Sequence, residues 1–181
     1  MFDEEQVISG CKRGERKFQE ALYQHFVKRM MVVAMRYTKG TLEAEDVLQE
    51  SFIKVFDSID KLKNKGALHA WMKKIVVNTA LSHQRSKLYL YPMVDVESLG
   101  NDAAFDYSLS DFELNDLLDM VQSLPTGCRV TFNLYAIEGY KHREIATMLG
   151  ISENTSKSQY ARAKSLLQAK IGNNESMNYG K

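Results

Sequence analysis

A helix–glycine–helix pattern near the C-terminus constrains the fold of this chain more than any other feature. Residues 138–170 read EGYKHREIATMLGISENTSKSQYARAKSLLQAK. Ile145 and Leu149 put an apolar stripe on a short helix, and Gly150 follows where a helix commonly ends in a left-handed conformation. Ser152 is then a good N-cap for a second helix. The pattern predicts two helices joined by a tight turn.

The second of these helices has an apolar inner face and a polar, basic outer face. Tyr160, Ala163 and Leu167, at spacings of three and four, can face inward. Side chains suited to phosphates and base edges occupy the other positions; they are Ser156, Lys157, Ser158, Gln159, Arg162 and Lys164. The sequence therefore predicts a DNA-binding helix-turn-helix. A helix-turn-helix that serves as a protein-interaction module remains the alternative.

The rest of the chain also reads as helical. It has only two prolines, and long Pro-free stretches rich in Leu, Ala, Lys, Glu and Met favour helices. Gly40 separates two stretches with apolar residues at helical period, and Thr41 is the predicted N-cap of the second stretch. The first stretch carries Phe18, Leu22, Phe26, Met30 and Val33, and the second carries Leu48, Phe52, Val55 and Ile59. No stretch alternates like a strand, so the predicted fold class is all-α.

An acidic segment divides the chain into two small helical domains. Pro92 to Asp119 contains no Lys or Arg, and its first part lacks helical periodicity. We predict a helical domain over residues 1–90, a flexible acidic linker over 91–110, a helix-turn-helix domain over 111–173 with Asp111 as its first N-cap, and a disordered tail over 174–181. Basic residues gather on both sides of the linker, which suggests two contacts with a polyanion. Solvated helix faces are the alternative.

The predicted helix over residues 42–59 has an acidic face with an apolar centre. Its members, opposite much of the core stripe, are Asp46, Gln49, Glu50 and Ile53. Docking of another protein would explain the exposed Ile53, although single exposed apolar residues are normal.

The predicted helix over residues 67–86 has a polar, basic face of a different kind. Lys74, Asn78, Ser82 and Arg85 lie within about 80° of one another on a helix. Such a face can meet a nucleic-acid backbone and its bases. In the preceding loop, Lys63, Asn64 and Lys65 could close over an extruded base. Trp71 fits the core better than a stacking role.

Several classes of protein are disfavoured. Cys11 and Cys128 are far apart and outside any Cys-x-x-Cys motif, so we expect free thiols in a reducing cytoplasm. The histidines are scattered and no phosphate-cradling glycine loop occurs, so we expect no enzyme, metal or cofactor. The acidic N-terminus lacks the apolar region of a signal peptide. The longest apolar run, residues 30–35, is far below the roughly 18 residues that span a membrane.

Three blocks of sequence, taken in order, resemble the extracytoplasmic-function sigma factors, the smallest members of the bacterial sigma-70 family. The blocks are AEDVLQESFIKVF at 44–56, AWMKKIVVNTALSHQRSK at 70–87 and LPTGCRVTFNLYAIEGYKHREIATMLGISENTSKSQYARAKSLL at 124–167. The resemblance covers residues 15–171. It implies a non-enzymatic factor that directs promoter-specific transcription initiation by core RNA polymerase.

The resemblance also implies roles for the candidate residues. Asp46, Gln49, Glu50 and Ile53 would dock on the clamp of the largest polymerase subunit. The loop and helix with Lys63, Asn64, Lys65, Lys74, Asn78, Ser82 and Arg85 would melt and read the minus-ten element. The helix-turn-helix would read the minus-thirty-five element and contact the flap of the second-largest subunit. An anti-sigma factor is a further expected partner.

Two positions depart from the family's usual pattern. Ser156 stands where Val is common, and Lys141-His142 replaces the usual Ser or Thr cap before the first helix of the motif. Ser156 could loosen the motif's core or present another polar group to DNA. A stand-alone helix-turn-helix regulator remains the alternative function; it would bind specific duplex DNA without polymerase.

Overall fold

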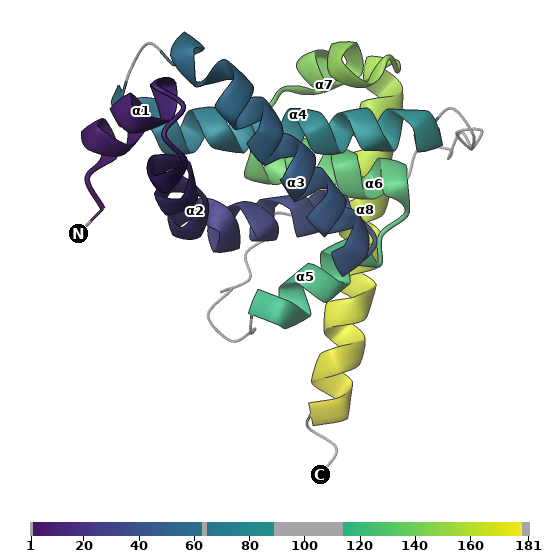
Figure 1. Ribbon diagram of the computed structural model, residues 1–181. Coiled ribbons are helices and arrows are strands. Elements are labelled where there is room, and N and C mark those ends of the chain that lie inside the picture. Colours follow the sequence, from purple (N-terminus) through teal and green to yellow (C-terminus); the bar gives the residue numbers. More distant parts are fainter. Residues whose placement is uncertain (1, 63–64, 89–113, 179–181) are drawn as a thin grey trace. The chain divides into compact units, whose positions relative to one another are not determined.

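The computed structural model describes residues 2–62, 65–88 and 114–178, and within them every regular element is a helix (Figure 1). The fold class is therefore all-α, as predicted. The chain divides into two compact units, Met1–His83 and Gln84–Lys181. The predicted linker and the predicted N-cap Asp111 lie outside the described residues.

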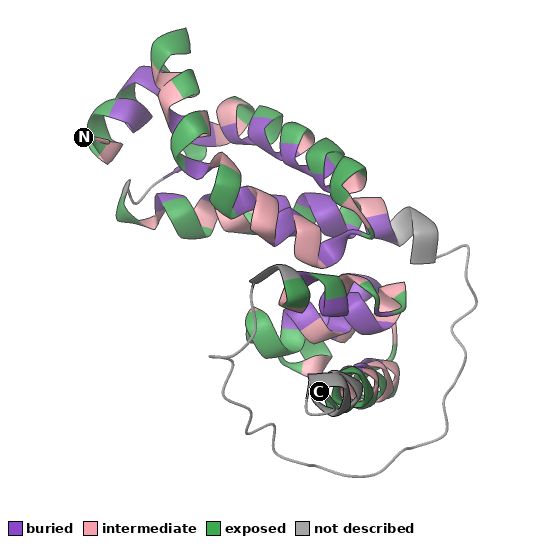
Figure 2. Cartoon of the chain, turned by 90° about the horizontal axis from the view of Figure 1, so that it is seen from below, coloured by how far each residue is buried: buried purple, intermediate pink, exposed green. Residues whose placement is uncertain are grey.

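The first unit contains α1 (Glu4–Lys12), α2 (Arg16–Tyr37), α3 (Thr41–Ser58), two 3-10 turns (Ile59–Lys61 and Lys65–Ala67) and α4 (Leu68–Leu88), whose last turns pass into the second unit. Helix α2 packs along both α1 and α3. Buried residues form stripes on the helices, with exposed residues on their other sides (Figure 2).

The apolar periodicity correctly identified the core of this unit. Every predicted position is buried except the half-buried Phe18; the buried ones are Leu22, Phe26, Met30, Val33, Leu48, Phe52, Val55 and Ile59. The predicted N-cap Thr41 is wrong by one residue. Gly40 is the N-cap and Thr41 the first helical residue, while the Lys39 N–H donates to a Glu43 carboxylate oxygen at 3.1 Å.

The sequence analysis missed α1. Asp3 caps this helix by accepting the Gln6 N–H at 3.1 Å. Its buried Gly10 leaves room for the Phe18 ring, which lies 2.0 Å from where a Cβ would be. This close contact requires glycine inside a helix, a position where glycine otherwise weakens the helix signal.

The second unit contains α5 (Leu114–Gln122), α6 (Thr126–Phe132), a π-helical turn η4 (Asn133–Ile137), α7 (His142–Leu149) and α8 (Glu153–Asn178). Pro125 ends the preceding segment and is the N-cap of α6. Helix α8 runs past the Asn173 boundary, so the predicted disordered tail begins too early. The core cluster contains Met120, Leu124, Cys128, Ala163, Leu167 and Ile171, with Phe132 and Leu166 against it.

Both cysteines are buried free thiols. Burial raises the pKa of the Cys11 thiol to about 11, and it also raises the pKa of the Cys128 thiol. Both side chains are therefore protonated, weakly reactive core residues. Over the described ranges, no helix has the length and apolar character needed to cross a membrane.

Candidate nucleic-acid and protein interfaces

The turn between α7 and α8 has the predicted geometry. Gly150 adopts φ +70° and ψ +35°, in the left-handed region. The Ile151 N–H donates to the Ala146 carbonyl at 3.0 Å. Ser152 caps α8 by accepting the Thr155 N–H on its hydroxyl at 2.9 Å. Together, the glycine turn and the cap fix the direction in which α8 leaves α7.

Four of the six predicted recognition residues present polar atoms outside the core of the second unit. Lys157 and Arg162 are exposed, and Ser158 and Lys164 are half-buried. The Lys157 ammonium lies 2.8 Å from the Glu153 carboxylate, and its hydrogen bond lowers the pKa of that carboxyl. Among the described residues no carboxylate forms a salt bridge with the exposed Arg162, so its guanidinium is the clearest candidate for a contact with a DNA phosphate or base.

Ser156 is a correction to the predicted DNA-binding set. It is fully buried, and its hydroxyl lies 2.9 Å from Nδ1 of His142. It therefore belongs to the interior of the helix-turn-helix. Gln159 also turns partly inward, because its side-chain oxygen accepts the Thr131 hydroxyl at 3.0 Å and its amide lies against Gly127.

The two departures from the family pattern meet at His142. Its ring stacks on Tyr135 of η4 with centroids 4.2 Å apart, and the Tyr135 ring lies 4.5 Å from that of Tyr160 in α8. These contacts connect η4, α7 and α8. The missing Ser or Thr cap is replaced in part by Glu144, whose carboxylate accepts the Lys141 N–H at 2.7 Å. The sequence signal for this pairing was the joint presence of a polar Ser156 and a histidine at the helix start.

Helix α3 presents the predicted acidic face to solvent. Asp46 and Gln49 are exposed, and Ile53 is 60% exposed. Leu42, which the sequence analysis did not include, is 80% exposed one helical turn before Asp46. Its spacing from Asp46, four residues, was the signal that could have found it. Two large apolar residues thus flank the polar part of this face.

Glu50 differs from these residues because it is half-buried and both of its carboxylate oxygens have partners. One lies 2.5 Å from the Lys54 ammonium, and the other lies 2.5 Å from Nε2 of His83. Hydrogen bonds from Lys54 and then His83 lower the pKa of the Glu50 carboxyl. Glu50 therefore lies at the edge of the α3 face, toward α4.

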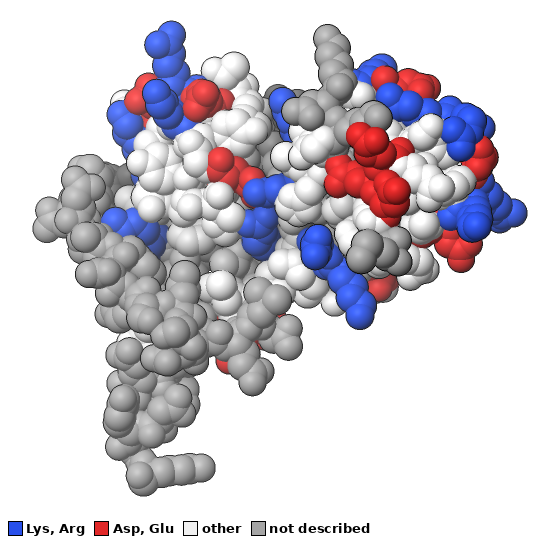
Figure 3. Space-filling model, turned by 90° about the vertical axis from the view of Figure 1, so that its left-hand side faces the viewer, with Lys and Arg blue, Asp and Glu red and all other residues white. Residues whose placement is uncertain are grey.

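Helix α4 exposes Lys74, Asn78 and Ser82, which recur every four residues and so lie along one side of the helix. Trp71 is half-buried. Lys63 and Asn64 lie outside the described residues, and the side chains of Lys65 and Arg85 are likewise not described. On the side drawn in Figure 3, patches of both charges alternate with uncharged surface. In the described parts of the chain, no group of three or more His, Cys, Asp or Glu residues could hold a metal ion.

Both units match models of known protein families. Residues 22–88 match sigma-70 region 2, and residues 114–167 match sigma-70 region 4. Between them the two matches cover more than half of the chain. They include α3 to α7 in full and the greater part of α2 and α8.

Two RNA polymerase sigma factors are similar to this chain over most of their length. The RNA polymerase sigma-H factor of Pseudomonas aeruginosa is 27% identical in an alignment of 175 positions that covers 89% of this chain and 90% of that protein. The ECF RNA polymerase sigma-E factor of Haemophilus influenzae is 25% identical over 91% of this chain and 93% of its own.

A solved structure supports the fold. The sigma factor RpoE of Bartonella quintana, determined in complex with the anti-sigma factor NepR, aligns with a TM-score of 0.50 and 22% identity over 84% of this chain and 96% of that one. The match to region 4 includes the helix-turn-helix, and the match to region 2 includes most of the helical first unit. The chain belongs to the sigma-70 family as an extracytoplasmic-function RNA polymerase sigma factor, a factor that directs transcription initiation at promoters and is not an enzyme.

Proposed function

We propose that this sigma factor binds core polymerase and promoter DNA through three different faces. The α3 face of Leu42, Asp46, Gln49 and Ile53 binds the clamp of the largest polymerase subunit. The α4 face of Lys74, Asn78 and Ser82, with Arg85 and the loop residues Lys63, Asn64 and Lys65, reads the melted minus-ten element. Lys157, Ser158, Arg162 and Lys164 on α8 contact the minus-thirty-five element.

The observation that carries the polymerase assignment is the exposure of Leu42 and Ile53. Large apolar side chains at the centre of a contact become buried when a partner binds, and that burial stabilises the complex. Asp46 and Gln49 lie between them in sequence and can set the orientation of a basic partner surface. We expect the second unit to add a contact with the flap of the second-largest subunit.

The DNA assignments rest on polar and cationic side chains at helical spacing. Lys74, Asn78 and Ser82 can meet backbone phosphates and the edges of unpaired bases. Arg162 can pair with a phosphate or with a guanine edge. This work is binding and strand separation, which requires no covalent chemistry, and we place it with the polymerase in the cytoplasm.

Asp46→Arg tests the polymerase face. It reverses a charge on an exposed position, so the fold should persist and binding to core polymerase should weaken. Co-elution with core in gel filtration measures the effect, and Glu20→Arg is the matched control because Glu20 is an exposed acid on α2, outside the α3 face. Undiminished co-elution of Asp46→Arg would show that this face does not bind polymerase.

Arg162→Ala tests the DNA face of α8. Promoter affinity of the complex with core should fall by about 1–3 kcal/mol if Arg162 contacts a base. Lys170→Ala, an exposed cation further along α8, is the control. Affinity equal to that of the wild type on a panel of promoters would show that Arg162 does not contact promoter bases. Measuring both proteins with and without core also tests the stand-alone regulator, which requires specific binding without core.

An anti-sigma factor would regulate this protein by covering the same surfaces. The α3 face is the strongest candidate because its apolar residues are exposed in the free chain. A cognate anti-sigma factor should therefore compete with core polymerase for the purified protein. Simultaneous binding of both would rule out a shared α3 face.

A further inference from the structure

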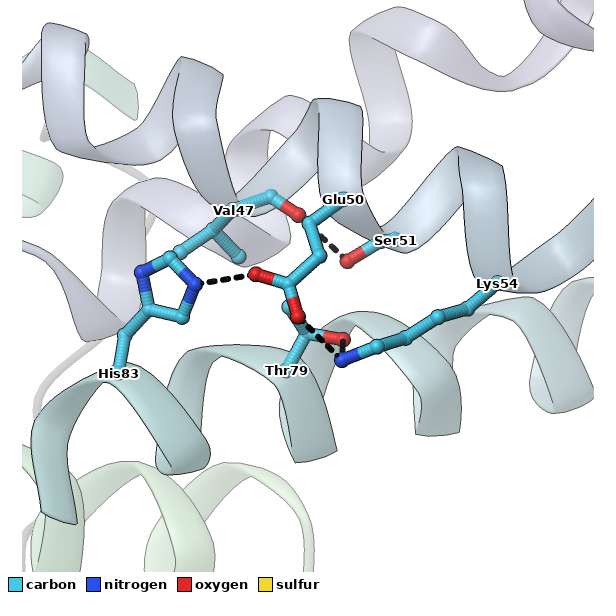
Figure 4. Close-up of polar contacts among 6 residues, drawn as sticks. All are labelled: Val47, Glu50, Ser51, Lys54, Thr79 and His83. Atoms are coloured by element: carbon cyan, nitrogen blue, oxygen red, sulfur yellow. Dashed lines mark hydrogen bonds and ion pairs between the residues drawn. The ribbon is translucent and has the colours of Figure 1, made fainter.

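Polar side chains at or beside two of the proposed binding faces contact neighbours in their own unit. In the first unit, Glu50 lies between Lys54 and His83 (Figure 4). In the second unit, the Lys157 ammonium lies 2.8 Å from the Glu153 carboxylate. Such contacts engage part of the hydrogen-bonding capacity of a side chain. A polar side chain without them presents all of its donors and acceptors to a ligand.

Asn154, in the first turn of α8, is a side chain of this second kind. It is exposed, and its amide has no hydrogen-bond partner among the residues that the structure describes. Its backbone is held in place, because the Ser152 hydroxyl caps the helix by accepting the Thr155 N–H at 2.9 Å. The cap therefore fixes the position from which the Asn154 side chain projects and leaves the amide available.

Asn154 lies at the centre of the proposed DNA face of α8. At about 100° per residue, Lys157 lies about 60° to one side of Asn154. Ser158 and Arg162 lie about 40° and 80° to the other side. Ala163, a member of the core cluster, lies about 180° away from Asn154 around the helix. Asn154 is therefore on the side of α8 opposite the core, between the cations that we assign to DNA.

The same angles separate Asn154 from Ser156. Ser156 lies about 200° further round the helix, where it is buried with its hydroxyl against His142. The N-terminal residues of the second helix of a helix-turn-helix contact base edges in the major groove. In this part of α8, Asn154 has the exposure that Ser156 lacks.

The amide of asparagine matches the major-groove edge of adenine. The amide oxygen is an acceptor and the amide nitrogen is a donor. Adenine presents the acceptor N7 beside the N6 amino donor, whereas guanine presents two acceptors, cytosine a donor and thymine an acceptor. Adenine is therefore the base that engages both ends of the amide at once.

We propose that Asn154 is a specificity-determining residue that selects adenine at one position of the minus-thirty-five element. Its amide nitrogen donates to N7 of the adenine, and its amide oxygen accepts a hydrogen bond from the N6 amino group. This rests on the proposed function of the α8 face, which places Lys157, Ser158 and Arg162 against the same element.

The experiment measures base preference in the complex of the full-length protein with core polymerase. Promoters that carry every base in turn at each position of the minus-thirty-five element compete for binding. The wild type should prefer adenine at one position by about fivefold to a hundredfold, the range for a bidentate contact. Asn154→Ala should lose this preference and keep those at the other positions. Gln168→Ala is the matched control, because Gln168 is an exposed amide about 21 Å further along α8.

Two further changes test the hydrogen bonds themselves. 7-Deazaadenine lacks the N7 acceptor, so at the preferred position it should weaken binding by the wild type and leave binding by Asn154→Ala unchanged. Asn154→Asp keeps the size of the side chain but offers only acceptors, so the preference at this position should shift from adenine to cytosine. Asp is favourable in the first turn of a helix, and thermal unfolding of each variant reports its folding.

Each result bears on a defined claim. A wild type without an adenine preference overturns the proposal, and so does a folded Asn154→Ala with the base preferences of the wild type. An equal loss of affinity for every base also overturns it, because that is the behaviour of a phosphate contact. Arg162→Ala distinguishes the underlying function: if neither variant changes promoter binding, the α8 face itself is wrong. If Arg162→Ala weakens binding and Asn154→Ala keeps the adenine preference, only the role of Asn154 fails.

Discussion

At the scale of single residues, His142 makes the second unit sensitive to acid. Burial lowers the pKa of its ring below the ordinary 6.5, the nearby Lys157 lowers it further, and Glu153 opposes them. Ser156, Tyr135 and Tyr160 are its other neighbours. The unfolded chain therefore takes up this proton more readily than the folded unit does.

The free energy of unfolding should consequently fall as the pH drops below about 6.5, and this fall should end once the pH is below the folded-state pKa. Urea unfolding of the second unit across this range measures the slope. His142→Gln should flatten it, whereas His69→Gln in the first unit should leave it unchanged. A slope that survives in His142→Gln would assign the acid sensitivity to other groups.

Arg129 stabilises the break between α5 and α6. It is fully buried, and its guanidinium donates to the carbonyls of Gln122 and Leu124 at 3.0 Å each. Arg129→Met keeps most of the apolar bulk and leaves both carbonyls without this donor. We expect a loss of about 2–3 kcal/mol in the free energy of unfolding, measured by urea denaturation. A loss below about 0.5 kcal/mol would show that water replaces the guanidinium.

Residues whose role depends on long-range contacts were the hardest to predict. Lys157 and Arg162 follow from the helix-turn-helix pattern alone, because helical period decides which side they occupy. Ser156 was placed on the wrong side because a serine in a polar run gives no sign of burial; only its contact with His142 explains it. Glu50 lies on the predicted side of α3, but its partner His83 is 33 residues away and has no local signal.

At the scale of elements, the joint between α7 and α8 depends on the backbone of one glycine. Gly150 has φ +70°, and a Cβ there would meet nothing within 4 Å. The cost of Gly150→Ala is therefore conformational, about 1–2 kcal/mol of unfolding free energy. Gly172→Ala is the opposite control: Gly172 is a helical glycine with equally open space, so alanine should stabilise α8 by about 0.5–1 kcal/mol.

Urea denaturation of the two variants measures both effects. Equal stabilisation by the two substitutions would contradict the expectation that the left-handed backbone of Gly150 is strained for alanine. The same comparison bears on function, because a change in the backbone conformation of this turn changes the angle at which α8 leaves α7. Gly150→Ala should therefore weaken promoter binding, and Gly172→Ala should not.

The helices were predicted well where the spacing of apolar residues and the helix-breaking residues Gly and Pro indicate the same boundaries. They were predicted poorly where these two signals conflict. The Gly40 and Pro125 breaks and the α7–α8 turn follow from residues with restricted or unusual backbone preferences. Helix α1 was missed because its Gly10 serves a close approach by Phe18, and the π-helical turn at Asn133–Ile137 continues α6 without any breaker. In both cases tertiary packing overrides the local signal.

At the scale of the whole molecule, the proposed DNA faces lie on two separate compact units. Lys74 belongs to the first unit and Arg162 to the second, and both are exposed. If each neutralises one promoter phosphate and acts as an independent site in one binding event, their effects on affinity should add. This additivity distinguishes two independent DNA contacts from a single composite surface.

Salt titration of promoter binding by the complex with core provides the measurement. Lys74→Ala and Arg162→Ala should each reduce the slope of log affinity against log salt by about 0.7–0.9, because each removes one site of counterion release. The double variant should show the sum of the two reductions. Lys28→Ala, an exposed cation on α2 outside both faces, should leave the slope unchanged. A double variant no different from one single variant would mean that only one of the two units meets the promoter backbone at these residues.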